Sequence, residues 1–443
     1  CSTDPNVILE SWLKLFYDTV KGLIPHRKIK VSPRDQPWIT PFVRHCINVR
    51  HRTYKRARSR NDLASWETFH TAGRNYCKAI QDAKRDYYKH LYESLNDPNT
   101  CGKKWWRLTK SVYGNKKGTG KSLPDIVYNG NVISDVKDKC EILNSFFVQQ
   151  SSLNDANVPL PTLSQIDATC DVPFIQSDTV KKILESLNPS KATGPDGISN
   201  YLLRNISSSM ASPLASLFNY SLQAGVFPKS WKIANVTPLY KKGDKSNPTA
   251  YRPVALLSCL SKVFEKCVAN VVQIHLDVNR LITKRQSGFI PGDSTVNQLI
   301  TINDIILSAF EKGDEVHAIF LDISRAFDKV WRRGLLHKLK FLFGIHGNFL
   351  AWFDSYISDR QQRVVINGCS SSLMKTDAGV PQGSVLGPIL FIMFINDLST
   401  AVISDLFLFA DDSTLINVFS EAPASIMKLN TDLLAIEDWA KTW

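Results

Sequence analysis

The sequence predicts an α+β fold in which an antiparallel sheet with packed helices follows a basic helical extension. Residues 42–95 keep apolar and aromatic side chains at a spacing of three or four, as on one face of a helix. From about residue 174, strand-like and helical segments alternate. Near the end of the chain, two apolar strand-like runs flank the acidic pair Asp411-Asp412. With 443 residues, the chain is long enough for two or three domains.

The positive charge is concentrated at the start of the chain. Residues 1–115 contain 22 Lys and Arg against 10 Asp and Glu, whereas the remainder contains 32 against 31. This asymmetry indicates a polyanionic partner, and nucleic acid is the first candidate. The alternative is that these basic residues form a solvated helix face without a binding role. The candidate nucleic-acid-binding residues are Arg50, Arg52, Lys55, Arg56, Arg58 and Arg60.

Composition argues against membrane and disulfide-rich classes. A membrane-spanning helix needs about 18 or more apolar residues, and the longest candidate, Val385 to Leu398, has about 14 and is interrupted by Gly387 and Pro388. Nine cysteines form no C-x-x-C pair, so neither a disulfide framework nor a zinc site is expected. We therefore expect the protein to reside in a reducing compartment.

The predicted domain boundaries follow changes in composition. The stretch Gly114 to Gly120 reads as a flexible linker because it is rich in Gly, Lys and Asn. We therefore divide the chain into a basic helical extension over residues 1–113, a linker with one helix over 114–173, and a folded α+β part over 174–443.

Hydrophobic periodicity places the main elements in order. Ser177-Asp178 can cap the first helix of the α+β part, and Asn367-Gly368 is a hairpin turn signal. The expected helices cover residues 136–147, 177–187, 205–224, 261–278, 294–312, 333–342 and 348–358. The expected strands cover 234–240, 316–322, 363–366 and 373–376.

Three carboxylates mark the candidate catalytic site. Asp411 and Asp412 sit side by side within apolar sequence, where mutual repulsion and burial favour a bound cation. Asp322 ends a second apolar strand and either caps a turn or joins the same site. Oxygen ligands suit Mg²⁺, with Mn²⁺ as the alternative. Three such acids can hold two metal ions, an arrangement that supports nucleotidyl transfer.

The motifs around these acids resemble a known family. Phe320–Asp328 looks like the first palm motif of reverse transcriptases, Gly379–Pro388 like their template–nucleotide motif, and Phe409–Asp412 like their third palm motif. The three occur in the same order along the chain. The form P-Q-G-S-V-L resembles non-LTR (LINE-type, jockey-like) retrotransposons more than retroviruses or group II introns. The segments that carry the resemblance are Asn188–Gly197, Tyr251–Leu257, Phe320–Asp328, Gly379–Pro388 and Phe409–Asp412.

The resemblance implies a right-hand polymerase with fingers and palm. Asp322 and Asp411 would be the principal catalytic metal ligands, Asp412 the weaker third, and the backbone carbonyl of Ile323 would complete the shell. Phe327 matches the aromatic residue that favours dNTPs over rNTPs, although an ordinary core aromatic would also fit its position.

The same resemblance implies a nucleotide pocket. Gln382 and Gly383 would line it, unless this stretch is simply a turn that needs Pro and Gly. Lys241 and Arg252 are candidates for binding the triphosphate, with Lys242 as an alternative to Lys241 and exposed surface charge as the other reading. The segment Arg285–Phe289 resembles one that lies near the template.

The expected partners are an RNA template, a DNA primer or target, and a dNTP substrate, in a ribonucleoprotein of the nucleus and cytoplasm; the oligomeric state stays open. The alternatives are a group II intron-type reverse transcriptase or maturase, and a non-catalytic RNA-binding relic. The sequence is expected to be an internal piece that lacks the endonuclease and the thumb. We therefore expect weak or no activity from it, although the catalytic residues are present.

Overall fold

A computed structural model describes residues 4–24, 36–98, 100, 102–112, 123–155, 157–420 and 422–443. The chain forms two compact units, one made of Cys1–Val20 with Leu123–Trp443 and the other of Lys21–Ser122. The predicted first domain, residues 1–113, thus includes a helix whose residues up to Val20 belong to the larger unit. The expected linker at Gly114–Gly120 lies entirely outside the described residues. Within the described residues, no helix combines the length and apolarity needed to cross a membrane.

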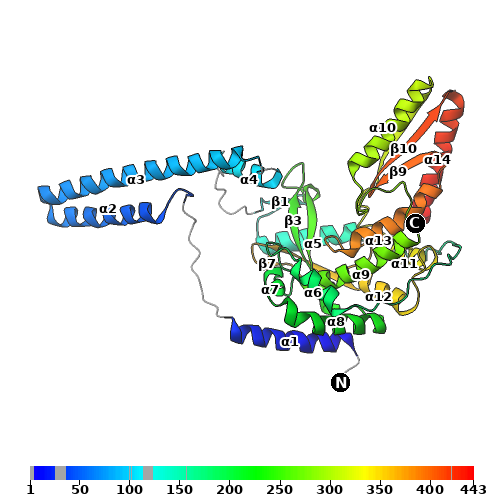
Figure 1. The fold of residues 1–443 in the computed structure, drawn as a ribbon, viewed down its shortest axis with the longest axis horizontal. Coiled ribbons are helices and arrows are strands. Elements are labelled where there is room, and N and C mark those ends of the chain that lie inside the picture. Colours follow the sequence, from blue (N-terminus) through cyan, green and yellow to red (C-terminus); the bar gives the residue numbers. More distant parts are fainter. Residues whose placement is uncertain are drawn as a thin grey trace. The chain divides into compact units, whose positions relative to one another are not determined.

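The smaller unit is built around an antiparallel helical hairpin (Figure 1). Helix α2 (Pro41–Arg60) begins where the Thr40 side chain accepts a hydrogen bond from the Val43 backbone N–H, at 3.2 Å. It ends at Asn61, whose φ of 51° is left-handed, and Asp62 then caps α3 (Leu63–Asn96). Helix α4 (Gly102–Val112) follows. The sequence prediction of long helices over 42–95 is confirmed.

Small apolar residues form the contact between α2 and α3. Val43 and Cys46 of α2 are buried against Ala79 of α3, with Ile47 and Tyr76 packed around them. The aromatic stripe therefore contributes to the helix–helix contact, as the sequence favoured.

Helix α1 (Pro5–Leu23) packs on the larger unit (Figure 1). The Tyr17 hydroxyl donates to the Asp196 carbonyl oxygen at 2.7 Å, and the Lys229 backbone N–H donates to the Asn6 side chain at 2.8 Å. The other helices of this unit are α5 (Val136–Gln150), α6 (Ser177–Glu185), α7 (Asn200–Asn205), α8 (Ser207–Ala224), α9 (Cys259–Val278), α10 (Thr295–Glu311), α11 (Arg332–Phe341), α12 (Gly347–Ile357), α13 (Leu386–Ile395) and α14 (Ala422–Thr442).

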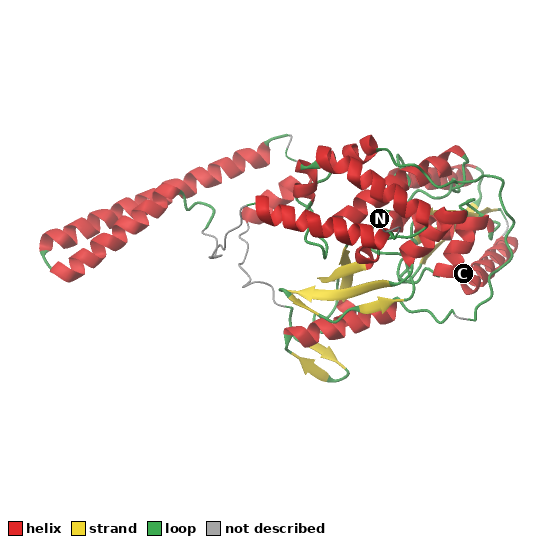
Figure 2. Cartoon of the chain, turned by 90° about the horizontal axis from the view of Figure 1, so that it is seen from below, coloured by secondary structure: helices red, strands yellow, loops and turns green. Residues whose placement is uncertain are grey.

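The strands of the larger unit form three sheets, and helices pack against them (Figure 2). A two-stranded hairpin pairs β1 (Ile126–Tyr128) with β2 (Asn131–Ile133). A three-stranded antiparallel sheet has the order β5-β10-β9, and a five-stranded sheet has the order β4-β3-β6-β7 with β8 paired to β6. The strand bounds are β3 (Ile233–Tyr240), β4 (Tyr251–Leu256), β5 (Glu315–Asp322), β6 (Arg360–Ile366), β7 (Cys369–Ser370), β8 (Met374–Thr376), β9 (Asp405–Phe409) and β10 (Asp412–Phe419).

The α+β prediction is confirmed, and three details differ from it. Strands β3 and β6 pair in parallel, so the five-stranded sheet is mixed rather than antiparallel. Across the Asn367-Gly368 turn, Ile366 pairs with Cys369 of β7, and β8 instead pairs with the start of β6. Ser177 lies inside α6, whose N-cap Gln176 makes no side-chain cap.

An aromatic cluster forms the centre of the larger unit. Phe218 of α8 and Phe264 of α9 stack with ring centroids 4.3 Å apart, and Trp231 and Trp352 meet Phe264 edge-on. All four rings are at most 1 % exposed. Burial of large rings stabilises each by a few kcal/mol, so this cluster holds α8, α9 and α12 together.

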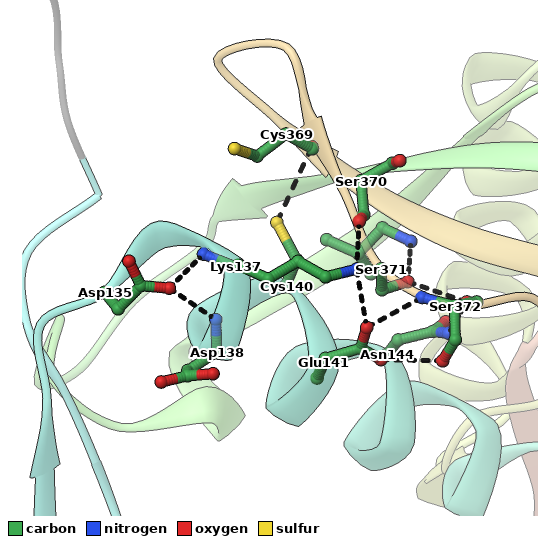
Figure 3. A network of polar contacts seen from close by, with 11 residues as sticks. Asp135, Lys137, Asp138, Cys140, Glu141, Asn144, Cys369, Ser370, Ser371 and Ser372 are labelled. Atoms are coloured by element: carbon green, nitrogen blue, oxygen red, sulfur yellow. Dashed lines mark hydrogen bonds and ion pairs between the residues drawn. The ribbon is translucent and has the colours of Figure 1, made fainter.

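A polar network connects α5 with β7 and the loop that follows β7 (Figure 3). Asp135 caps α5 by accepting from the Lys137 and Asp138 backbone N–H groups. Glu141 then accepts from both the backbone and the hydroxyl of Ser372, at 2.8 and 2.7 Å. These bonds hold the five-stranded sheet against a helix from the opposite end of the sequence.

Candidate active site

The hairpin β9–β10 presents the acidic pair. Strand β9 is apolar and largely buried, and Phe409 pairs with Asp412 at the start of β10. Ala410 lies in the turn with a φ of +59°, a left-handed conformation that is unusual for a residue with a Cβ. The predicted arrangement of two apolar strands with the acids at their turn is confirmed.

Strand β5 brings Asp322 to the same place. Asp322 pairs directly with Asp412 across the β5–β10 ladder, and the Ile323 backbone N–H donates to the Asp411 carbonyl oxygen at 3.4 Å. Side chains directly opposite each other in an antiparallel pair lie on one face, with Cβ atoms about 4.5–5.5 Å apart. Like charges in that position are destabilising unless something neutralises them.

The three carboxylates fit a hard cation by their chemistry. They offer only oxygen ligands, the type that Mg²⁺ or Mn²⁺ prefers, and Ile323, whose carbonyl is the predicted fourth ligand, follows Asp322 directly. Among the described residues, however, no three His, Cys, Asp or Glu side chains converge on one point. The backbone register brings the three acids to neighbouring positions at one edge of the sheet.

A cleft of about 600 Å³ opens over these acids. Most of the residues predicted for metal and nucleotide binding line it. They are Asp322, Asp411, Ile323, Phe327, Gln382, Gly383, Lys241 and Arg252. Asp412 and Lys242 are not in its lining. The cleft therefore collects side chains from β5, from the β9–β10 turn, from the loop before α13 and from the β3–β4 hairpin.

Phe327 lies on the floor of the cleft. Its ring stacks on Phe391 of α13 with centroids 4.5 Å apart and meets Phe289 edge-on at 6.0 Å. The residue is half-buried, so the ring belongs to the core on one side and to the cleft on the other. The two interpretations that the sequence left open, a core aromatic and a pocket aromatic, both describe part of its position.

The loop 379–383 is held directly against the turn that follows β5. The Val380 and Gly379 backbone N–H groups donate to the carbonyl oxygens of Phe327 and Val330, each at 2.9 Å. A Cβ on Gly379 would lie 2.7 Å from the Phe327 carbonyl oxygen, closer than any side chain tolerates. Gly383 has no room either, since its Cβ would lie 2.7 Å from the Ala255 carbonyl oxygen. Glycine at position 383 therefore allows the loop to pack closely against β4.

Asp328 orients Gln382. The Gln382 side-chain amide donates to Asp328 Oδ1 at 2.7 Å. Burial raises the pKa of the Asp328 carboxyl, while that hydrogen bond and the charges of Arg325 and Arg252 lower it in part. The sequence singled out Gln382 for the pocket, but pairing with an acid 54 residues away requires the fold.

Glu265 is a buried acid that sequence reasoning missed. It is fully buried in α9, accepts from the Val385 backbone N–H at 2.7 Å and binds the hydroxyls of Ser261 and Tyr356. It therefore places a carboxylate at the N-terminus of α13, where the helix dipole favours negative charge. A single Glu inside an amphipathic helix gave no signal for this role.

The predicted nucleic-acid-binding cluster lies on α2 of the smaller unit. All six side chains are exposed, as electrostatic contact with a polyanion requires. The Arg50 guanidinium also lies over the rings of Phe69 and Tyr76 on α3, at 5.9 and 5.4 Å, so it contributes to the hairpin contact. The remaining five are Arg52, Lys55, Arg56, Arg58 and Arg60.

Comparison with known proteins finds a family match in the C-terminal part of the larger unit. Residues 240–443 match the family model described as "Reverse transcriptase (RNA-dependent DNA polymerase)". All three candidate catalytic carboxylates and the whole predicted nucleotide pocket lie within the matched residues.

Several curated proteins are similar to much of the chain. The "Probable RNA-directed DNA polymerase from transposon BS" of Drosophila melanogaster is 28 % identical over 94 % of this chain and 48 % of its own length. The "RNA-directed DNA polymerase from mobile element jockey" is 33 % identical over 63 % of this chain and 32 % of its own length in Drosophila melanogaster. The Drosophila funebris protein of the same name is 28 % identical over 98 % of this chain and 49 % of its own length. The chain thus spans about half the length of two of these relatives and about a third of the other.

Proposed function

We propose that this chain, which belongs to the LINE-type reverse transcriptases, carries out RNA-directed DNA synthesis at the β5–β9–β10 edge. The observation that carries the proposal is the pairing of Asp322 with Asp412 beside Asp411, at the mouth of a cleft lined by Phe327 and Gln382. In this reaction the primer 3′ oxygen bonds to the α-phosphorus of a dNTP. The bond to the β-phosphate breaks, pyrophosphate leaves and the hydroxyl proton passes to solvent.

The divalent ion is also part of the proposal. Reverse transcriptases generally use divalent metal ions, and we assign Mg²⁺, with Mn²⁺ as its substitute, to Asp322, Asp411, Asp412 and the Ile323 carbonyl. Bound there, two such ions would supply the positive charge that acidifies the primer hydroxyl and stabilises the pyrophosphate leaving group. The protein's contribution is to keep three carboxylates on two adjacent strands at one edge.

The other residues of the cleft bind and select the nucleotide. Lys241 and Arg252 lie at the end of the β3–β4 hairpin, where two cations suit the triphosphate. Phe327 presents its ring edge to the sugar, so that a ribose 2′-hydroxyl would collide with it. Gln382, oriented by Asp328, contacts the nucleotide.

We assign the three-stranded sheet to the palm of a right-hand polymerase and the five-stranded sheet to its fingers. All six cations of the α2 cluster would bind the phosphates of the RNA template or the DNA target. Exposed cations on α2 suit this role because phosphate contacts need charge rather than a shaped pocket.

Primer extension by the purified chain tests the proposal. A DNA primer annealed to an RNA template is incubated with the single complementary dNTP and Mg²⁺, and one-nucleotide addition is measured in a single turnover. We expect template-directed addition that stops when the metal is chelated and is lost in Asp322→Asn, which removes the charge but keeps the volume. Addition that continues in Asp322→Asn would overturn the assignment.

A further inference from the structure

The segment 283–289 runs along the end of β9, directly beneath the acidic turn. The Leu408 backbone N–H donates to the Arg285 carbonyl oxygen, and the Ser287 N–H donates to the Leu408 carbonyl oxygen, each at 2.9 Å. Gln286 and Leu408 thereby form a parallel bridge. Arg285 adds an ion pair with Asp405 and lies over the Phe407 ring. The segment therefore acts as a short extra strand on β9.

One side chain of this segment reaches the turn itself. Gln286 is 4 % exposed, and its Oε1 accepts from the Ala410 backbone N–H at 3.1 Å and from the Gly288 backbone N–H at 2.9 Å. Both lone pairs of this oxygen are thus used for backbone groups. Ala410 is the residue before Asp411 and holds the left-handed φ of +59°.

The surroundings leave this contact little freedom. A Cβ on Gly288 would lie 2.4 Å from the Ala410 nitrogen, so only glycine lets the two backbones approach this closely. The Leu408 carbonyl oxygen, which accepts from Ser287, also accepts from Gln298 of α10 at 3.0 Å. Gln298 thus holds the strand, whereas among the described side chains it is Gln286 that binds the Ala410 backbone in the turn.

The nitrogen end of the same amide indicates that Gln286 serves a purpose other than stabilising the fold. Gln286 Nε2 is buried and has no hydrogen-bond partner among the described residues. An unsatisfied buried donor is costly, whereas an apolar residue of the same shape would avoid the cost. A left-handed alanine likewise persists only where its surroundings enforce it. The unsatisfied amide donor and the left-handed alanine are both unfavourable, and they occur together next to Asp411.

We propose that Gln286 is a positioning residue that fixes the backbone at Ala410 and thereby aims the Asp411 carboxylate at the divalent cation. This inference rests on the proposed function, because it assumes that Asp411 binds metal. It assigns no contact with substrate to Gln286. Its consequence is that metal affinity depends on a glutamine more than 120 residues away from the acid.

Mn²⁺ binding to the full chain tests the proposal without relying on activity. The free ion is followed by its electron paramagnetic resonance signal. Gln286→Met keeps the volume and removes the acceptor of both backbone hydrogen bonds, and we expect Mn²⁺ affinity to fall roughly tenfold, as the loss of the buried bond to Ala410 implies. Single-turnover addition should slow by a similar factor, while the KM for dNTP stays within about twofold. Gln298→Met, which loses a bond to the same strand but not to the turn, should bind Mn²⁺ like the wild type.

A second variant separates positioning from a general loss of structure. Glycine adopts positive φ without the penalty of a Cβ, so Ala410→Gly combined with Gln286→Met should recover much of the lost Mn²⁺ affinity. Wild-type affinity in Gln286→Met, equal weakening in Gln298→Met, or no recovery in the double variant would each overturn the proposal. If Asp411→Ala also leaves Mn²⁺ binding intact, the metal assignment itself is wrong, which distinguishes the two failures.

Discussion

The acidic edge of the three-stranded sheet and the basic face of α2 hold their charged residues in opposite ways. At the acidic edge, buried contacts from other elements fix the functional groups: Asp328 binds Gln382 and Glu265 binds the start of α13. On α2, the cations are exposed, and only Arg50 has ring contacts. Chemistry at one phosphorus atom needs atoms placed within a fraction of an ångström, whereas attraction to a polyanion needs only charge of one sign.

The largest difference should appear when the shape of the cleft changes. Phe327→Val removes the ring edge that faces the sugar, so we expect the preference for dNTP over rNTP, as the ratio of kcat/KM values, to fall roughly 10- to 100-fold. Phe289→Leu changes another aromatic of the same cleft and should leave this ratio unchanged. A ratio that stays constant in Phe327→Val would return that ring to a purely core role.

A smaller effect should come from the hydrogen bond between Asp328 and Gln382. Asp328→Ala frees the amide, and we expect the KM for dNTP to rise roughly tenfold. Asp328→Asn keeps an acceptor oxygen and should lose much less. In a double-mutant cycle with Gln382→Ala, the two losses should not add, since both remove one contact. Full additivity would show that Asp328 acts elsewhere.

The smallest effect per residue should be on α2. Replacing Arg56, Arg58 and Arg60 by Gln should lower RNA affinity several-fold and reduce the slope of log affinity against log salt by up to about 2. Single-turnover addition from a saturated complex should not change. The matched control replaces three exposed lysines of the larger unit, Lys182, Lys229 and Lys266, and should leave the salt slope alone. An unchanged slope in the arginine variant would make the α2 cluster an ordinary solvated face.

The same contrast explains what could be predicted from the sequence. Periodicity located the long helices and β5, because apolar spacing is a local property. Strand β4 was missed because Pro253 interrupts it, and the structure explains its presence, since β4 is an edge strand where a missing N–H is tolerated. The motifs located the acids and the pocket loop.

The supporting residues could not be found in this way. Gln286, Asp328 and Glu265 contact partners that are distant along the chain, at 410, 382 and 385, and nothing in their local sequence indicates these partners, although Gln286 and Asp328 lie in segments that carry the resemblance. The structure shows Gln286 bound to the acidic turn, and its expected place near the template stays a prediction. The sequence thus indicates candidate chemical groups, whereas the contacts that we propose to position them are visible only in the fold.

The most direct test measures both regions in one variant. In Asp411→Ala, nucleotide addition and RNA affinity are determined on the same preparation with the same template. We expect addition to fall by at least about a thousandfold, as for removal of an essential catalytic group, while RNA affinity stays within about twofold. Addition that survives the change, or RNA affinity that falls together with it, would contradict the separation of a positioned catalytic edge from a binding face that relies on charge.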